Sequence, residues 1–196
     1  MTSLRWIATG AAMLTGCGLV AAPAQAGYVV TLEQMGSNIV ATGSGAVDLT
    51  GLTTRIRPGF RDGAVSPSKA GIWTGPATLT AVDTYFFVHT YPANFGNGGL
   101  TSANSGSGDM VGLAGILLFV PQDYVSNTAL SDSATYDNAT FASLDVTPGT
   151  YEWTWGTGAN QTATLDIVAS AVPEPASLLL LSTGLLGFAA YQRRRG

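Results

Sequence analysis

Few side chains in this 196-residue chain are suited to catalysis. His89 is the only histidine and Cys17 the only cysteine, so a serine nucleophile would need His89 as its base. No serine lies in the Gly-x-Ser-x-Gly turn that many hydrolases use for their nucleophile. His89 also falls in a stretch that predicts a β-strand, where a structural role is the alternative. We therefore expect that the chain is not an enzyme.

Calcium is the one candidate cofactor. Asp132, Asp137 and Asn138 lie in one predicted loop with Asp123 nearby, and carboxylate and amide oxygens suit Ca²⁺. Their spacing lacks the glycine and the final glutamate of an EF-hand, and the turn-forming tendency of Asp and Asn explains them equally well. No His or Cys cluster has zinc-ligand spacing, so the sequence predicts no zinc site.

Three large aromatic residues alternate along one stretch near the end of the chain. Tyr151, Trp153 and Trp155 would therefore point to the same face of a strand. On a solvent-facing surface they would form a flat platform on which sugar rings can stack. On an inward face they would be part of a hydrophobic core, as large aromatic residues usually are. Glu152 and Thr154 on the opposite face favour the core, and the sugar platform is the alternative.

The elements that carry these residues read as an all-β domain over Gly27–Ala171. Short alternating apolar runs are separated by Gly, Pro, Asn and Asp, and no convincing helical period occurs. We expect an antiparallel, jelly-roll-like β-sandwich. The predicted strands are Tyr28–Gln34, Ala77–Thr90 and a central Met110–Val120, and Asn38–Thr42 with Gly45–Leu49 predict one or two more strands. The predicted loops are Arg55–Lys69 and Asn94–Asp109.

The last quarter of this domain predicts an antiparallel three-strand meander. Its strands are Asn138–Val146, Tyr151–Trp155 and Thr162–Val168. Pro and Gly at the centre of Thr147–Thr150 predict a type II β-turn between the first two. Ala163, Leu165 and Ile167 alternate with polar residues, as expected for a half-buried strand.

The C-terminal segment, residues 172–196, has three parts. Pro173, Glu174 and Pro175 precede an uncharged run, Ala176–Tyr191, that would span roughly 24 Å as a helix and so marginally cross a membrane. Arg193, Arg194 and Arg195 follow and would hold that end on the cytoplasmic side. A buried core helix is the alternative, and the terminal arginines argue against it.

These three parts in order resemble the PEP-CTERM sorting signal. The resemblance implies a substrate of an exosortase, a membrane-embedded transpeptidase-like enzyme of Gram-negative bacteria that make exopolysaccharide. It also implies that the tail is cut near Pro173–Pro175 and that the protein is released or transferred to the cell surface. The expected path is therefore an inner-membrane-anchored intermediate and then the cell surface or extracellular matrix.

The N-terminal residues 1–26 resemble a secretory signal peptide. Arg5 precedes an apolar run, and Ala24-Gln25-Ala26 fits the rule for cleavage by signal peptidase, which would leave Gly27 as the first residue. Leu14-Thr15-Gly16-Cys17 resembles a lipoprotein box, so lipidation at Cys17 is the alternative. Cleavage after Ala26 leaves no cysteine, so the domain's stability would come from core burial without disulfides.

The part between the two signals is acidic. Residues 27–175 carry four basic and twelve acidic residues, a formal net charge of −8. That charge argues against nucleic acid as a partner. We expect an exported structural or adhesive protein of an exopolysaccharide-associated envelope or biofilm. The alternative is a carbohydrate-binding module of the extracellular matrix.

Overall fold

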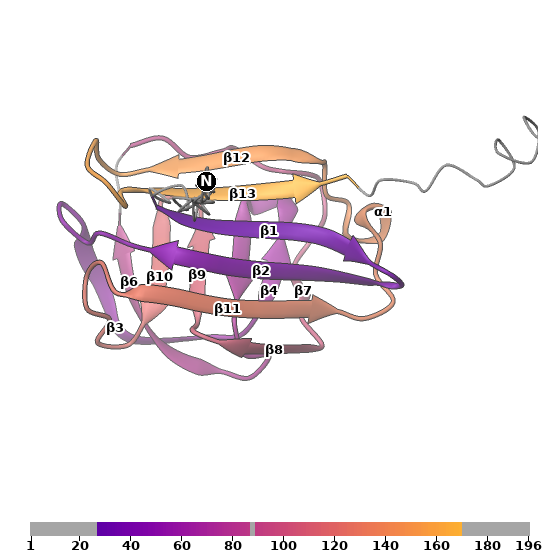
Figure 1. Ribbon diagram of the computed structural model, residues 1–196, viewed down its shortest axis with the longest axis horizontal. Helices are drawn as coiled ribbons and strands as arrows, with labels where there is room; N and C mark the ends of the chain where they lie inside the picture. The colour runs from indigo at the N-terminus through magenta and orange to yellow at the C-terminus, as the bar shows by residue number, and fades with distance from the viewer. Residues whose placement is uncertain (1–26, 87–88, 170–196) are drawn as a thin grey trace, which may run out of the picture.

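Two β-sheets build the domain in this computed structural model, which describes residues 27–86 and 89–169. The strands of one sheet run across those of the other, and the two sheets form two layers (Figure 1). The first sheet has the order β12 (Gly149–Thr154), β13 (Thr162–Val168), β1 (Tyr28–Met35), β2 (Asn38–Ala46), β11 (Ala129–Tyr136) and β8 (Ser105–Gly108).

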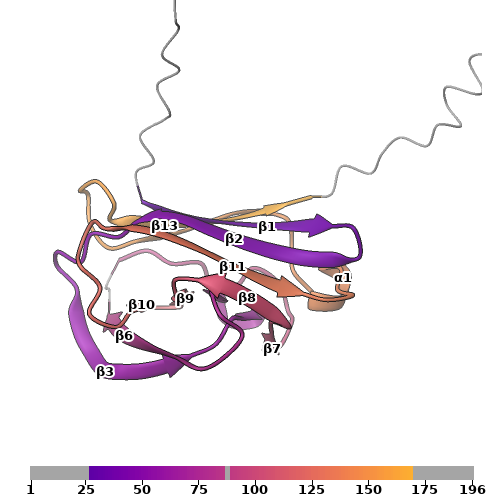
Figure 2. The same ribbon diagram turned by 60° about the horizontal axis from the view of Figure 1, so that its bottom comes forward.

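The second sheet lies behind the first in Figure 1. Figure 2 shows the two layers from another side, with β3 at the margin of the second. The strand order of the second sheet is β3 (Thr53–Arg61), β6 (Thr80–Phe86), β10 (Leu117–Pro121), β9 (Val111–Ala114), β5 (Gly71–Thr74), β4 (Ala64–Ser66) and β7 (Thr101–Ser102). A 3-10 turn, η1 (Pro67–Lys69), and a one-turn helix, α1 (Phe141–Leu144), complete the described elements.

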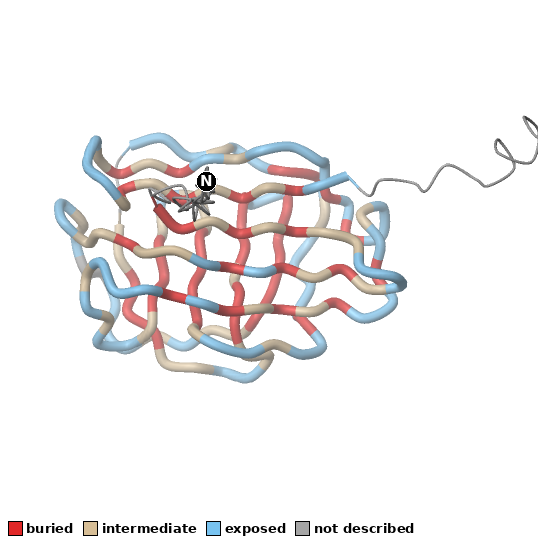
Figure 3. The backbone as a smooth tube through the Cα atoms, viewed as in Figure 1, coloured by how far each residue is buried: buried red, intermediate tan, exposed pale blue. Residues whose placement is uncertain are grey.

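The hydrophobic core lies between the sheets. Alternate residues of the crossing strands are buried, which gives the banded pattern of Figure 3. In β13 the prediction is confirmed: Ala163, Leu165 and Ile167 are buried in the core, and the polar residues between them are half-buried. The predicted strand at Tyr28–Gln34 is also confirmed as β1. The chain is therefore all-β, with two facing sheets as the alternation indicates.

One pairing differs from the predicted antiparallel sandwich. β1 pairs with β13 in parallel, with Tyr28 opposite Ala163 and Glu33 opposite Val168. Parallel neighbours need a long connection, and here nearly the whole domain lies between the two strands. As a result the domain begins and ends on neighbouring central strands of the first sheet, at opposite ends of the pair.

The predicted meander is wrong in its first strand. Residues 141–144 form α1, because Thr140 and Ser143 cap each other: the Thr140 side chain accepts from the Ser143 N–H, and the Ser143 side chain accepts from the Thr140 N–H. Such reciprocal capping satisfies two amide donors at the start of the turn. Of the predicted meander only the last two strands are present, as the antiparallel pair β12 and β13. Gly149, which was predicted in the β-turn, is the first residue of β12.

Two predicted loops and one predicted strand are also corrected. Residues 55–69 contain most of β3, all of β4 and η1, and residues 94–109 contain β7 and β8. The apolar run 110–120 is two strands, because Gly115 adopts φ +53° in the turn between β9 and β10. Asn38–Ala46 is one strand, and the strand predicted over residues 77–90 is described only as β6, Thr80–Phe86.

Candidate functional site

A buried polar cluster joins the two sheets. The hydroxyl of Tyr28 in β1 donates to the carboxylate of Asp132 in β11, 2.8 Å from each carboxylate oxygen. It also lies 2.8 Å from the hydroxyl of Thr74, which comes from β5 in the second sheet. Gly43 leaves the space for this cluster, because a Cβ there would lie 1.9 Å from the Tyr28 hydroxyl oxygen. The three side chains therefore hydrogen-bond the layers together across an otherwise apolar core.

Burial sets the acid–base properties of this cluster. Loss of water around the carboxyl raises the pKa of Asp132 to about 6, despite the hydrogen bonds from Thr74 and Tyr28 that oppose the shift. Burial and the nearby Asp132 charge also raise the pKa of Tyr28 well above its ordinary value. Tyr28 is thus a hydrogen-bond donor at neutral pH, and Asp132 is the group that titrates near pH 6.

The free energy of unfolding should therefore rise as the solution is acidified from about pH 7.5 to pH 5. The folded state binds the Asp132 proton more tightly than the unfolded chain, so protonation favours folding, with an expected gain of about 1–2 kcal/mol over that range. Urea unfolding at a series of pH values measures it. Asp132→Asn, which cannot titrate, should flatten the profile; a variant that keeps the wild-type slope would contradict the assignment.

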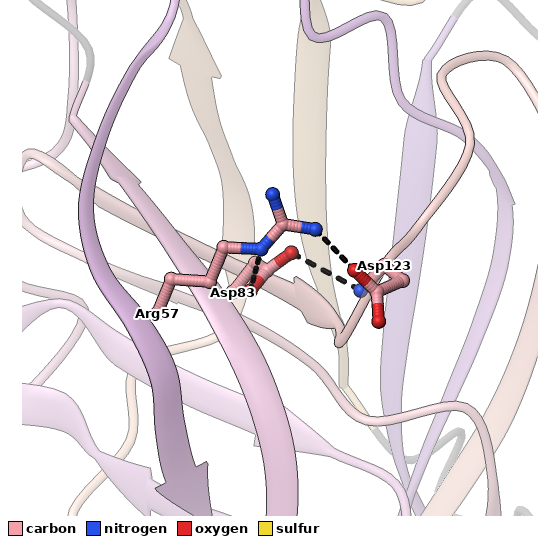
Figure 4. Close-up of polar contacts among 3 residues, drawn as sticks. All are labelled: Arg57, Asp83 and Asp123. Carbon is pink, nitrogen blue, oxygen red and sulfur yellow. Dashed lines mark hydrogen bonds and ion pairs between the residues drawn. The ribbon is translucent and has the colours of Figure 1, made fainter.

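A second charged cluster lies where β3, β6 and the segment after β10 meet. Figure 4 shows the Arg57 guanidinium between two carboxylates. Its Nε lies 3.3 Å from Oδ1 of Asp83, and Nη2 pairs with Asp123. Asp83 is almost fully buried and also accepts from the amide of Asp123 at 3.1 Å. The single arginine offsets part of the charge of the two acids and links the edge strand β3 to β6 and to the segment after β10.

A pocket on the outer face of the second sheet is a candidate ligand site. In β5, Ile72 faces the core and Thr74 reaches Tyr28 of the first sheet, so the intervening Trp73 points away from the first sheet. That face is turned from the viewer in Figure 1. The pocket has a volume of about 390 Å³ and is lined by Phe60, Arg61, Asp62, Ala64, Trp73, Leu79 and Leu100.

A small aromatic cluster supports this pocket. The rings of Trp73 and Phe119 lie 5.8 Å apart with an interplanar angle of 56°. The guanidinium of Arg61 lies 4.5 Å from the centre of the Phe119 ring, a cation–π distance. Phe119 packs with Val82 and Met110 in a cluster separate from the core between the sheets. The pocket wall is therefore anchored to a second, outer apolar cluster.

The pocket residues were missed by sequence reasoning. Phe60, Arg61 and Asp62 lie in the stretch predicted as a loop, which is in fact the end of β3 and the start of the connection to β4. Trp73 comes from β5, and Leu100 lies just before β7. The one signal in the sequence was that this stretch holds Arg55, Arg57, Arg61 and Lys69, all four basic residues of the domain.

Trp153 and Trp155 lie in the core, which is the interpretation that the sequence favoured over a sugar platform. Trp153 is 0% exposed and Trp155 3% exposed, and both belong to the core between the sheets. Trp155 donates through Nε1 to the carbonyl of Asp48, and half-buried Tyr151 packs against the core. Because the Trp153 and Trp155 rings are buried, they offer no surface on which a sugar could stack, and the alternative of a three-ring platform is wrong.

The other predicted site residues do not come together. His89 lies at an exposed bend outside the named strands, not in the predicted strand. Asp132 is buried in β11 instead of lying in a loop with Asp137, and Asp123 pairs with Arg57. Among residues 27–86 and 89–169, no group of three or more His, Cys, Asp or Glu side chains is placed to hold a metal ion. The proposed Ca²⁺ ligands are thus separated.

Both predicted signals lie outside the described residues. The N-terminal residues outside the description include Cys17 and the cleavage-site residues Ala24 and Ala26. The C-terminal ones include the Pro173–Pro175 motif, the segment Ala176–Tyr191 and Arg193–Arg195. Within the part of the chain that the structure describes, no helix is long and apolar enough to cross a membrane.

Comparison with known proteins identifies the C-terminal segment. The family model of the PEP-CTERM protein-sorting motif matches residues 171–195. No curated protein and no solved structure matches the chain. The matched residues contain the Pro-Glu-Pro sequence, the uncharged run and the arginines that carried the resemblance in the sequence.

Proposed function

Because the chain carries a PEP-CTERM protein-sorting motif, we propose that it is exported and processed by an exosortase, and then acts as a structural or adhesive protein of the cell surface or extracellular matrix. The motif match at residues 171–195 carries this proposal. In the intermediate, the uncharged run Ala176–Tyr191 sits in the inner membrane with its arginines on the cytoplasmic side. Signal peptidase removes residues 1–26.

The contacts of the folded domain suit the proposed structural role. Its buried polar groups link the two sheets, and its ion pairs fix an edge strand. The single histidine of the chain is exposed at a bend. Twelve acidic residues against four basic ones in residues 27–175 suit a protein that stays soluble after its tail is removed.

The termini of the exported protein test this proposal directly. Intact mass and terminal peptides of protein recovered from cells and medium should show a chain that starts at Gly27 and ends near Pro173–Ser177. A chain that keeps Arg193–Arg195 in the mature fraction would mean that the tail is a permanent anchor and would overturn exosortase processing. A start at a lipidated Cys17 would make the protein a lipoprotein and contradict the predicted cleavage after Ala26.

A further inference from the structure

We propose that the pocket over Trp73 binds a sugar ring of a polysaccharide. The inference rests on the adhesive role proposed above and adds to it the class of ligand and the place where it binds. The pocket contains none of the three residues of the alternative sugar platform, Tyr151, Trp153 and Trp155. Four features of the pocket carry the argument: its floor, its polar wall, its rim and its position on the domain.

The floor is an indole laid flat against the sheet. A Cβ at Gly71 would lie 2.8 Å from the far carbons of the Trp73 ring, and one at Gly112 would lie 2.1 Å from its Cδ1. Gly112 is the cross-strand partner of Trp73, so the ring rests on two positions that only glycine leaves open. Because the sheet backbone supports one side of the indole, the pocket receives a rigid aromatic surface whose position costs little to fix on binding.

The wall supplies hydrogen-bond donors and acceptors. Arg61 donates through Nη1 to the carbonyl of Phe60 at 2.7 Å, and its guanidinium is held over Phe119. Both ion pairs of the described residues involve Arg57, so no salt bridge among these residues engages Arg61 or the neighbouring Asp62. An arginine offers five N–H donors and a carboxylate only acceptors. Together they suit hydroxyl groups, each of which both donates and accepts.

A sugar ring matches this combination better than an apolar partner does. Its C–H face can lie on the electron-rich face of an aromatic ring, while its hydroxyls point sideways to polar groups. An apolar side chain in the same place would cover the remaining N–H donors of Arg61 and the Asp62 carboxylate without offering them hydrogen bonds, which is unfavourable. The volume of about 390 Å³ falls at the lower end of the range for small-ligand sites, roughly 300–1,000 Å³.

The rim and the position of the pocket favour a polymer. Phe60, Leu79 and Leu100 line it and are 56%, 72% and 70% exposed, so the rim offers apolar surface open to solvent that neighbouring units of a chain could contact. The described domain ends after β13, in the first sheet, whereas the pocket lies on the outer face of the second. A protein held through its C-terminal segment can therefore present the pocket away from its point of attachment.

Binding can be measured on the exported protein by two methods. Affinity electrophoresis uses gels that contain dextran, xylan, alginate or the exopolysaccharide purified from the producing cells, and at least one should retard the protein. Tryptophan fluorescence, titrated with the retarding polysaccharide, should change on binding, because Trp73 is half-buried while Trp153 and Trp155 are buried in the core. Trp73→Ala should weaken binding by about tenfold or more.

Matched variants separate binding from folding. Tyr91→Ala removes an exposed aromatic outside the pocket and should bind like the wild type. If Trp73→Ala fails to fold by circular dichroism, Asp62→Asn together with Arg61→Gln tests the polar wall and should also lose retardation. Unchanged binding by a folded pocket variant would overturn the proposal.

Two other outcomes would also overturn the sugar site. One is that none of the four polysaccharides retards the wild type. The other is concentration-dependent association of the wild type in size-exclusion chromatography that Trp73→Ala abolishes, which would make the pocket an interface between copies. Neither outcome changes the terminal masses, so failure of this proposal is distinguishable from failure of exosortase processing.

Discussion

Trp153→Ala should lower the free energy of unfolding by about 3–5 kcal/mol, the largest effect we expect from a single substitution in the domain. Trp153 is fully buried, and its cross-strand partner in β13 is Ala163, which is buried as well. The cavity left by the indole would open between the two sheets, where the crossing strands leave little room to collapse. Because small domains are stable by about 5–15 kcal/mol, the variant would lose a large share of that stability. Urea unfolding followed by circular dichroism measures the change.

Two variants of the same strand serve as controls for this substitution. Trp153→Phe keeps most of the buried ring and removes an indole N–H that has no hydrogen-bond partner in the described structure, so its loss should be much smaller. Glu152→Ala changes an exposed side chain on the opposite face and should stay within about 0.5 kcal/mol of the wild type. A Trp153→Ala protein with wild-type stability would mean that these rings do not form the core.

Replacing Pro173, Glu174 and Pro175 together by alanine should abolish processing, which is the second large effect. Proline disfavours helix in the residue before it, so we expect the motif to keep the segment before Ala176 extended and the apolar helix to begin only after Pro175. Alanine favours helix and would extend it through the cleavage region. We expect the full-length chain to accumulate in the membrane fraction and the shortened form to disappear, as read from intact mass and immunoblots of cell fractions.

Substitutions of the tail arginines test whether processing depends on their positive charge or on arginine itself. Arg193–Arg195 replaced by three lysines should still be processed, since either cation is retained on the cytoplasmic side of a membrane. The same positions replaced by glutamine lose that retention, and processing should fall strongly. Equal processing of the lysine and glutamine variants would show that positive charge does not orient the tail. Normal processing of the alanine-substituted motif would show that Pro173–Pro175 is not the recognition sequence.

The substitutions in the domain and in the tail report on separate properties. Trp153→Ala acts on a core that forms between two sheets, whereas the tail variants act on residues outside the described domain. A tail variant should therefore keep the wild-type unfolding midpoint in its exported part. Trp153→Phe should in turn keep its normal terminal masses. Measuring both properties on each variant distinguishes a failure to fold from a failure to be sorted.

The sequence by itself determined the features that depend on neighbouring residues. Period-two alternation marked β1 and β13, because successive side chains of a strand point to opposite faces. The tail was identified from a motif, an apolar run and a charge cluster that are contiguous in the chain, and the family match at residues 171–195 agrees. The same local reasoning failed at residues 138–146, where the mutual capping of Thr140 and Ser143 favours a helical turn over a strand.

Only the tertiary structure decided which faces are covered and which residues meet. Alternation put Tyr151, Trp153 and Trp155 on one face, and the packing of the two sheets buries Trp153 and Trp155 and leaves Tyr151 half-buried. The pocket joins Arg61 of β3 to Trp73 of β5, and the Trp73 ring needs the space left by Gly112 in β9. The strand order brings these residues together, and strand order depends on long-range pairing free energies that no short stretch of sequence contains.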